Sequence, residues 1–136
     1  YELAKSKRKE SDLFTYKARV LRAVDGDTLR VKIELGFGNR IRQYLRLREI
    51  DCRELDKPGG KKAKAFVEEC LRPVSFILLR SSRSEKYDRY LSDVFIPLNS
   101  KSTVRPSGPE AKITYEGEEF LYLNNELLLR GLAVRE

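Results

Sequence analysis

The most informative stretch of this chain is LRLREIDCRE, residues 45–54. Leucine and arginine alternate through its first half, which is the period of a β-strand with one face against a core. We expect this strand to span residues 40–50, with Leu45 and Leu47 pointing inward. The side chains expected to point outward are those of Arg46, Arg48 and Ile50. The alternation stops there, so the chain should enter a turn or loop.

Two acids follow the strand, Asp51 and Glu54, three residues apart. An arginine such as Arg46 binds phosphate through its planar fork of donors. Carboxylates hold hard cations or accept protons. An arginine followed by two carboxylates is therefore compatible with a phosphate-cleaving site, although an edge strand with a solvated charged face has the same pattern.

Composition favours a polyanionic partner. The chain has 136 residues, enough for one domain with one core. It carries 28 Lys and Arg against 21 Asp and Glu, a net charge of +7. Nucleic acid is the first candidate partner and an anionic membrane surface the second, while a basic protein without such a partner would have the same charge. No apolar run is long enough to span a membrane.

The chain contains no histidine, which excludes His-based zinc sites, Ser-His-Asp triads and imidazole bases. Catalysis would have to use carboxylates, Lys, Arg, Tyr or Cys. The two cysteines, Cys52 and Cys70, form neither a disulfide framework nor a metal-ligand pattern. The sequence starts at Tyr1 and has no Met, so we expect a leader or further domain to have been removed.

The other elements are arranged around the strand that ends before Asp51. A turn at Asp25-Gly26, where Gly26 should adopt a positive φ, joins the first two strands, and a turn at residues 36–39 adds the third strand to form a β-meander. A helix over residues 61–71 carries Cys70 on its apolar stripe and should end before Pro73. The strands expected are residues 13–24, 28–35, 40–50, 74–80 and 89–98. Five strands with one helix after the third predict a Greek-key OB-fold barrel with one or two packed helices.

The two ends complete the domain plan. We expect a basic N-terminal tail over residues 1–12 and one OB-fold domain over residues 13–136, with an inserted loop rich in Ser, Pro and Gly at about 99–112. The last elements expected are a hairpin over residues 113–123, an N-cap at Asn124 and a short helix over residues 126–130.

Four short motifs lie on this plan. They are VDGDT at 24–28, LRLREID at 45–51 followed by Glu54, KYDR at 86–89 and LNNELLLRGLA at 123–133. In this order, over about residues 13–133, they resemble the staphylococcal nuclease (thermonuclease) family. The resemblance implies a calcium-dependent endonuclease that hydrolyses the phosphodiester bonds of DNA and RNA and leaves 3′-phosphates.

The resemblance also implies a calcium site. Asp27 and Asp51 match the family's calcium carboxylates, which are the hard oxygen ligands that Ca²⁺ prefers. Cys52 stands where the family has a Thr that ligates through its backbone carbonyl, and a Cys supplies that carbonyl equally well.

Five further residues match the family's catalytic and phosphate-binding positions. Glu54 matches the general base that orients or deprotonates the attacking water. Arg46 and Arg89 match the two arginines that neutralise the transition state. Lys86 and Tyr87 match the outer phosphate contacts.

The resemblance implies single-stranded DNA and RNA as preferred partners, a monomer without membrane contact, and a secreted or periplasmic setting. The sequence departs from the family at Arg53, which replaces a Pro, and at Asp88, which replaces a Gly. The tyrosines that stack on the substrate base are also absent.

Two alternatives belong to other functional classes. The chain would fit a non-catalytic OB-fold module that binds single-stranded nucleic acid through a basic groove and aromatic side chains. It would also fit a protein-interaction domain that keeps the fold. Acids that face a phosphate repel it, so their presence favours a metal-dependent enzyme over a pure binder.

Overall fold

The computed structural model describes residues 15–84 and 89–136. The predicted tail at residues 1–12 and the predicted phosphate contacts Lys86 and Tyr87 lie outside these ranges. The strands are β1 (Thr15–Asp25), β2 (Thr28–Gly36), β3 (Asn39–Leu47), β4 (Ile50–Cys52), β5 (Ile77–Ser84), β6 (Arg89–Pro97), β7 (Lys112–Tyr115), β8 (Glu118–Tyr122) and β9 (Ala133–Arg135). The helices are α2 (Gly60–Leu71), the 3-10 turn η2 (Pro109–Ala111) and α3 (Leu123–Leu129).

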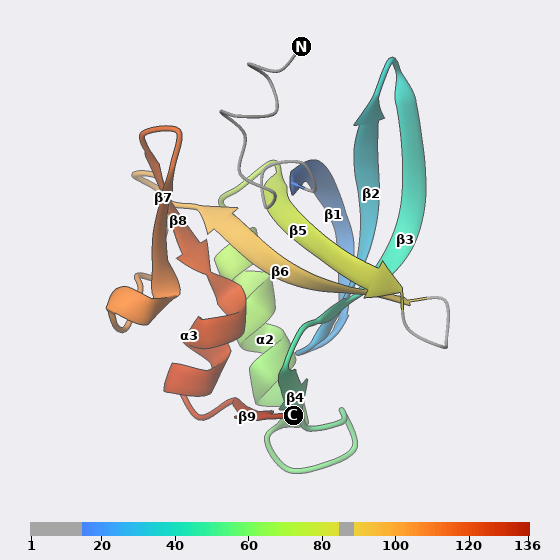
Figure 1. Cartoon of the computed structure of the whole chain (residues 1–136). Coiled ribbons are helices and arrows are strands. Elements are labelled where there is room, and N and C mark those ends of the chain that lie inside the picture. Colours follow the sequence, from blue (N-terminus) through green and yellow to red (C-terminus); the bar gives the residue numbers. More distant parts are fainter. Residues whose placement is uncertain (1–14, 85–88) are drawn as a thin grey trace.

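Five strands form a closed barrel (Figure 1). β1, β2 and β3 form the predicted antiparallel meander, and β5 pairs antiparallel with both β1 and β6. The parallel pair of β3 with β6 closes the ring. A closed, mixed five-stranded barrel with two packed helices is the predicted OB-fold, so the fold class is confirmed.

Strand alternation accounts for the core of the barrel. On β2, Leu29, Val31 and Ile33 are buried, while the residues between them face outward. On β3, Leu45 and Leu47 are fully buried, as the sequence predicts. The inward faces of neighbouring strands therefore meet along one apolar interior, which stabilises the barrel through burial of apolar surface.

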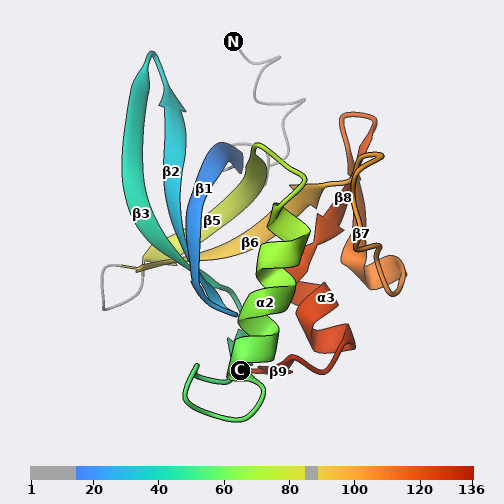
Figure 2. The ribbon, with the colours of Figure 1, turned by 180° about the vertical axis from the view of Figure 1, so that it is seen from behind.

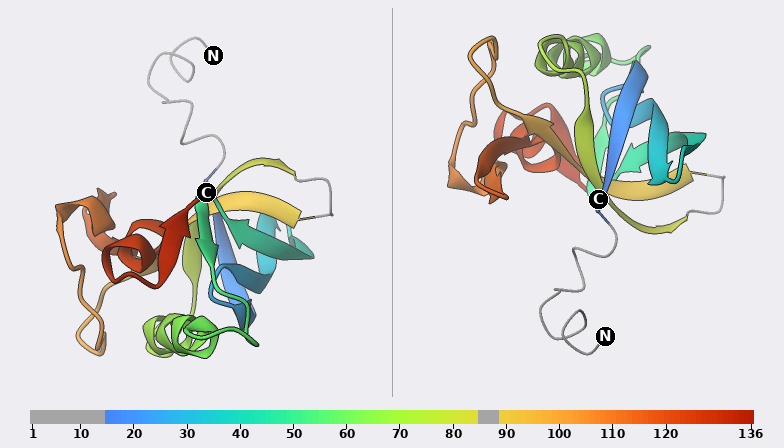
Figure 3. Two further views of the ribbon diagram at one scale, coloured as in Figure 1. Left: turned by 90° about the horizontal axis from the view of Figure 1, so that it is seen from below. Right: turned by 90° about the horizontal axis from the view of Figure 1, so that it is seen from above.

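The two helices lie together at one end of the barrel, opposite the tip of the β2–β3 hairpin (Figure 2). Helix α2 buries Ala63, Phe66, Val67 and Cys70, in agreement with the predicted apolar stripe. The guanidinium of Arg130, which follows α3, lies 4.6 Å from the ring centroid of Phe66. The β7–β8 hairpin extends the sheet from β6 and stands to one side of the barrel (Figure 3).

The strand predicted over residues 40–50 is two strands. β3 ends at Leu47, and Glu49 then adopts a left-handed φ of 63°. This turn starts the short strand β4, which pairs with β9, a strand that was not predicted. The prediction that Ile50 points outward is therefore wrong, because the turn reverses the alternation and only 1% of Ile50 is exposed.

Asn124 is not the N-cap of the last helix. α3 begins at Leu123, which is one residue before Asn124 and three residues before the predicted helix start at residue 126. Its N-cap is Tyr122. The Asn124 side chain is buried: its amide donates to the carbonyls of Arg48 and Ser92, and its oxygen accepts from the N–H of Val94. Asn124 therefore links β6 to the turn after β3 through hydrogen bonds and does not cap the helix.

The loop at 99–112 is fastened to α3. The carboxylate of Glu126, which is fully buried, accepts hydrogen bonds from the backbone N–H and the hydroxyl of Ser107 and forms an ion pair with Arg130. A buried carboxylate is tolerated when several donors surround it, as here.

In the part of the chain that the structure describes, no helix is long and apolar enough to cross a membrane.

Candidate functional site

Arg46 lies at the centre of a cluster of charged side chains at the end of β3. Its side chain is only 14% exposed. Its Nη1 atom lies 3.5 Å from Oδ2 of Asp27. Its Nη2 atom lies 3.1 Å from Oδ1 of Asp51 and 3.2 Å from Oε2 of Glu136. Burial alone would lower the pKa of Arg46, but the three carboxylates outweigh burial and raise it, so the guanidinium is charged at every ordinary pH.

The turn that carries Asp27 is held close to α2 by a glycine. A Cβ atom on Gly26 would lie 2.7 Å from Cβ of Ala63 and 2.9 Å from Sγ of Cys52. The predicted positive φ at Gly26 is wrong, since Gly26 is not among the described glycines with positive φ. The glycine is required here because the side chains of Ala63 and Cys52 pack directly against its backbone and leave no room for a Cβ atom.

Asp27 is buried and almost fully hydrogen-bonded. Its Oδ2 atom accepts from the N–H of Cys52 at 2.8 Å, and its Oδ1 atom accepts from the hydroxyl of Thr28 at 3.2 Å. Burial raises the pKa of Asp27, and the nearby carboxyl of Asp25 raises it further. The Cys52 N–H and the Arg46 guanidinium oppose this shift but do not cancel it. Burial and the proximity of Asp25 thus disfavour the charged form of Asp27 more than its contacts with the Cys52 N–H and Arg46 favour it.

Cys52 presents its backbone, and not its thiol, to this cluster. The N–H and C=O groups of one strand residue point to the same side, so the Cys52 carbonyl faces the side on which its N–H meets Asp27. The thiol is buried, and burial together with Asp27 raises its pKa to about 12. A neutral thiol is a poor metal ligand at neutral pH, whereas the carbonyl is always available as a hard oxygen donor.

The oxygen donors at this site suit calcium, but Arg46 now lies between them. Two carboxylates and one carbonyl are the ligand types that Ca²⁺ takes in proteins. The guanidinium contacts both Asp27 and Asp51, so it supplies the positive charge that these acids require. Within the described residues, no group of three His, Cys, Asp or Glu side chains is arranged to hold a metal ion.

Glu54 lies in the exposed loop that follows β4. Its backbone carbonyl accepts from the N–H of Lys57 at 2.9 Å. A Cβ atom on Gly60 would lie 1.9 Å from this carbonyl, so a glycine is required where the loop meets α2. For the residues that the structure describes, no hydrogen bond or ion pair joins the Glu54 carboxylate to Asp27, Arg46 or Asp51. The loop fixes the backbone of Glu54 near the cluster and leaves its side chain in solvent.

Arg89 is the first residue of β6, and only its backbone is described. Its Cα partner in the parallel pair is Tyr44, two residues before Arg46 on β3. The barrel closure therefore brings Arg89, the last residue of the KYDR motif, to the strand that carries Arg46. The structure brings together Asp27, Arg46, Asp51 and the Cys52 backbone, four of the eight predicted site residues.

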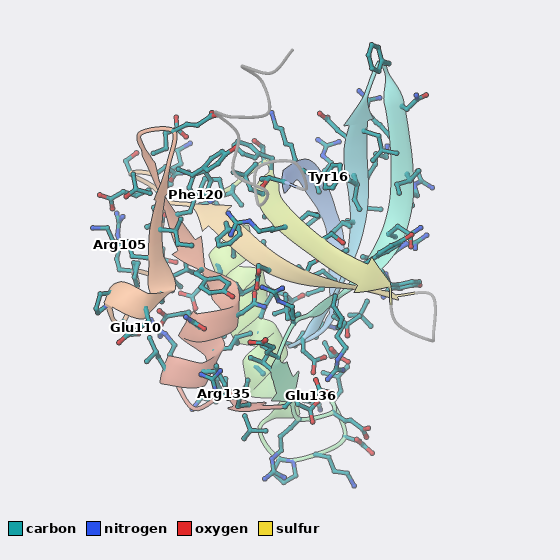
Figure 4. All side chains as sticks on the ribbon, in the orientation of Figure 1. Tyr16, Arg105, Glu110, Phe120, Arg135 and Glu136 are labelled. Atoms are coloured by element: carbon teal, nitrogen blue, oxygen red, sulfur yellow. The ribbon has the colours of Figure 1, made fainter. Side chains whose placement is uncertain are left out.

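Two residues of the cluster were not predicted. Asp25 accepts from the N–H of Asp27 at 3.2 Å, whereas its predicted role was only that of a turn residue. Glu136 reaches Arg46 because β9 pairs with β4, and Figure 4 labels it beside β4. The DGD spacing was a signal for Asp25, but no local pattern in the sequence relates Glu136 to a residue 90 positions away.

No protein-family model and no curated protein sequence matches this chain. The charged cluster around Arg46 is therefore the basis for any functional proposal.

Proposed function

We propose that this protein is a member of the staphylococcal nuclease family and a calcium-dependent nuclease that hydrolyses phosphodiester bonds in DNA and RNA and leaves 3′-phosphates. The observation that carries the proposal is the contact of one guanidinium with two carboxylates, Asp27 and Asp51, at the end of a barrel strand. An arginine beside acids on a protein of net charge +7 is suited to a phosphodiester and a cation together.

Arg46 has the main phosphate-binding role in this proposal. Its planar fork of donors matches two phosphate oxygens, and its pKa is raised, so its charge does not depend on pH. A bound phosphate would take the place of the carboxylates that the guanidinium now contacts. Arg89 is proposed to stabilise the charge that develops on the leaving oxygen, and Lys86 and Tyr87 to contact the flanking phosphates.

Glu54 has the proton-transfer role. Its side chain is exposed, so water reaches it, and its backbone is fixed by the turn to Lys57. A carboxylate that is fixed at its backbone and free at its side chain is able to orient or deprotonate an attacking water molecule.

A calcium ion held by Asp27, Asp51 and the Cys52 carbonyl would polarise the phosphoryl oxygen and lower the pKa of bound water. The raised pKa of Asp27 supports this assignment, because a bound cation would join Arg46 in offsetting the burial of the carboxylate and its proximity to Asp25.

A second candidate function is a non-catalytic module that binds single-stranded nucleic acid. One observation favours it: Arg46 already neutralises Asp27 and Asp51, so the cluster is complete as a structural ion-pair network without a metal. Such a module would bind the same strands and cut none of them.

A digestion assay separates the two functions. The protein is incubated with labelled single-stranded DNA and RNA in 5–10 mM Ca²⁺, roughly the range needed for weak carboxylate sites, and in EGTA. We expect cleavage with Ca²⁺ only, with 3′-phosphate ends. Glu54→Gln and Arg46→Lys should each lose about 100-fold or more in kcat, because each removes one positioned catalytic group.

Glu118→Gln is the matched control, since it removes an exposed carboxylate from β8, outside the cluster. Circular dichroism confirms that each variant folds. Binding of the strands without cleavage in any metal would favour the non-catalytic module.

A further inference from the structure

The outward face of the β1–β2–β3 meander is strongly basic. Strand pairing places its side chains in rows that cross the sheet. The first row is Arg22, Arg30 and Tyr44, and the second is Arg19, Lys32 and Arg42. A third pair, Glu34 and Arg40, lies nearer the hairpin tip and forms a weak ion pair at 4.0 Å.

Within the described residues, none of the cations in the two rows forms an ion pair with a carboxylate of the chain. The neighbouring inward residues, such as Val31 and Ile33, fill the core, while every residue of the two basic rows is exposed or half-buried. Between the level of Thr28 and the tip of the β2–β3 hairpin, Glu34 is the sole acid among the outward side chains of β1, β2 and β3 that the structure describes. Like charges side by side on a sheet repel one another, so the rows cost stability unless a polyanion neutralises them.

Tyr44 is held in a fixed position on this face. The guanidinium of Arg30 lies over its ring, 4.4 Å from the centroid, and Arg22 donates to its hydroxyl at 3.5 Å. Tyr44 is 37% exposed. Arg30 covers one face of the ring, and this exposure shows that part of the Tyr44 side chain stays accessible to a ligand.

The rows continue from Arg46. Arg46, Tyr44, Arg42 and Arg40 are alternate residues of β3 and share its outward face. Six residues of strand cover about 20 Å, room for roughly six phosphates of a stacked single strand.

We infer that the outward face of β1–β2–β3 is a binding track for a single-stranded polynucleotide that continues from the Arg46 cluster, with one base stacked on Tyr44. The inference rests on the proposed function and extends it from one phosphodiester to the nucleotides on one side of it. The basic rows neutralise phosphates, and the ring supplies a base platform that does not depend on sequence. A duplex is a poorer ligand because its bases are not free to stack on Tyr44.

Binding is measured by fluorescence anisotropy with labelled dT2 and dT12 in EDTA, so that no cleavage takes place. The track variant is Arg19→Gln/Arg42→Gln, which leaves Arg22 and Arg30 beside Tyr44 unchanged. The control is Lys61→Gln/Lys62→Gln, the same charge change on the exposed face of α2.

The track variant should bind dT12 at least tenfold more weakly, with a salt slope lower by about 1.4, since each lost phosphate contact on a single strand contributes about 0.7. Binding of dT2, which covers the Arg46 cluster alone, should change little. The α2 control should keep most of its affinity for dT12. Equal losses in the two double variants, or no loss in either, would overturn the track.

Tyr44 is tested separately. Tyr44→Leu should weaken dT12 binding about 5-fold to 150-fold, the range for loss of one stacked base. It should leave binding of inorganic polyphosphate, an anion without bases, unchanged. Tyr44→Phe keeps the ring and should bind dT12 nearly as well as the wild type. Unchanged dT12 binding by Tyr44→Leu would overturn the stacked base.

The track and the nuclease proposal fail in different ways. If the wild-type protein binds dT12 through the basic rows but cuts no strand in Ca²⁺, the nuclease function fails and the track is supported. If it cuts strands while the track variant binds dT12 normally, the track is overturned and the nuclease function is untouched.

Discussion

At the scale of single residues, Asp27 is where stability and proposed function oppose each other. It is buried, beside Asp25, and its pKa is raised by burial first and by that neighbour second. A raised carboxyl pKa means that the folded state binds the proton more tightly than the unfolded state does. Ionisation of Asp27 therefore lowers the free energy of unfolding as pH rises from the ordinary value of 3.8 through the folded pKa.

We therefore predict that Asp27→Asn abolishes calcium-dependent cleavage and raises Tm at pH 7. The amide keeps an oxygen for the Cys52 N–H and removes the buried charge. The gain in Tm should vanish below pH 3.8, where the wild-type carboxyl is neutral in both states. Thermal unfolding from pH 3 to 8, followed by circular dichroism, measures this. A variant less stable than the wild type at pH 7 would show that the Arg46 ion pair outweighs burial.

A second prediction concerns Cys52. Its N–H meets Asp27 and its carbonyl faces the same side, while its thiol is buried with a pKa raised to about 12. Cys52→Thr should therefore keep cleavage within a few-fold, since it keeps the backbone. Cys70→Asp should instead destabilise the protein by about 3 kcal/mol, because it buries a carboxylate on the apolar face of α2. Urea denaturation and the digestion assay measure the two effects. A folded Cys52→Thr variant without activity would give the thiol a role.

At the scale of elements, the sequence predicts well those features that strand alternation and local turn signals determine. The meander, α2 and the β7–β8 hairpin follow from apolar period and turn residues, and so do the inward side chains of Leu45 and Leu47. The end of β3 did not follow, because the left-handed turn at Glu49 is set by the long-range pairing of β4 with β9. A three-residue strand has no period of its own.

The residues of the candidate site likewise divide into those that the sequence predicts and those that only the tertiary fold brings together. Arg46 and Asp51 are predicted from a strand that carries an arginine and ends in acids, and Asp27 from the resemblance that the VDGDT motif carries. The structure joins all three. Glu136 is not predicted, because only the tertiary fold brings it to Arg46. A residue type that suits a local role can also be assigned that role wrongly. Asn124 has the chemistry of an N-cap, yet it is buried and forms hydrogen bonds with residues distant in sequence.

A third prediction tests the bridge that Asn124 forms between elements. Asn124→Ala removes one bond to the Val94 N–H and two bonds to the carbonyls of Arg48 and Ser92. The loss should be about 3 kcal/mol, because buried polar groups lose their partners. Asn125→Ala is the matched control on the same helix, and it loses only an exposed bond to the Glu110 carbonyl. Its cost should stay below about 1 kcal/mol. Equal costs in urea denaturation would mean that Asn124 does not bridge these elements.

At the scale of the whole molecule, barrel closure makes one surface from distant parts of the chain. β3 pairs with β2 on one side and with β6 on the other, so the DGDT turn, Arg46 and Arg89 all lie around one strand. The alternation of side chains along β3 makes the basic rows continuous with the Arg46 cluster. In the proposed function, a net charge of +7 would attract a polyanion from a distance, and the rows and the cluster would determine where it binds.

The last prediction concerns the competition between Arg46 and a metal for the same two acids. A cation that binds only the folded state stabilises it by about 1.4 kcal/mol at ten times its Kd, which is roughly 5 °C in Tm for a domain of this size. We expect Ca²⁺ to raise the Tm of the wild type and not that of Asp27→Asn/Asp51→Asn. Arg46→Gln should show a larger calcium shift than the wild type, because the guanidinium no longer neutralises Asp27 and Asp51.

The same Arg46→Gln variant should still fail to cut nucleic acid, because the phosphate-binding fork is lost. Tighter metal binding with lost cleavage would separate the two roles of the cluster in one protein. Differential scanning fluorimetry at pH 8, with Mg²⁺ at the same ionic strength as a control, measures the shifts. A calcium shift that persists in Asp27→Asn/Asp51→Asn would place the cation elsewhere. A smaller shift in Arg46→Gln would show that the guanidinium supports the metal site and does not compete with it.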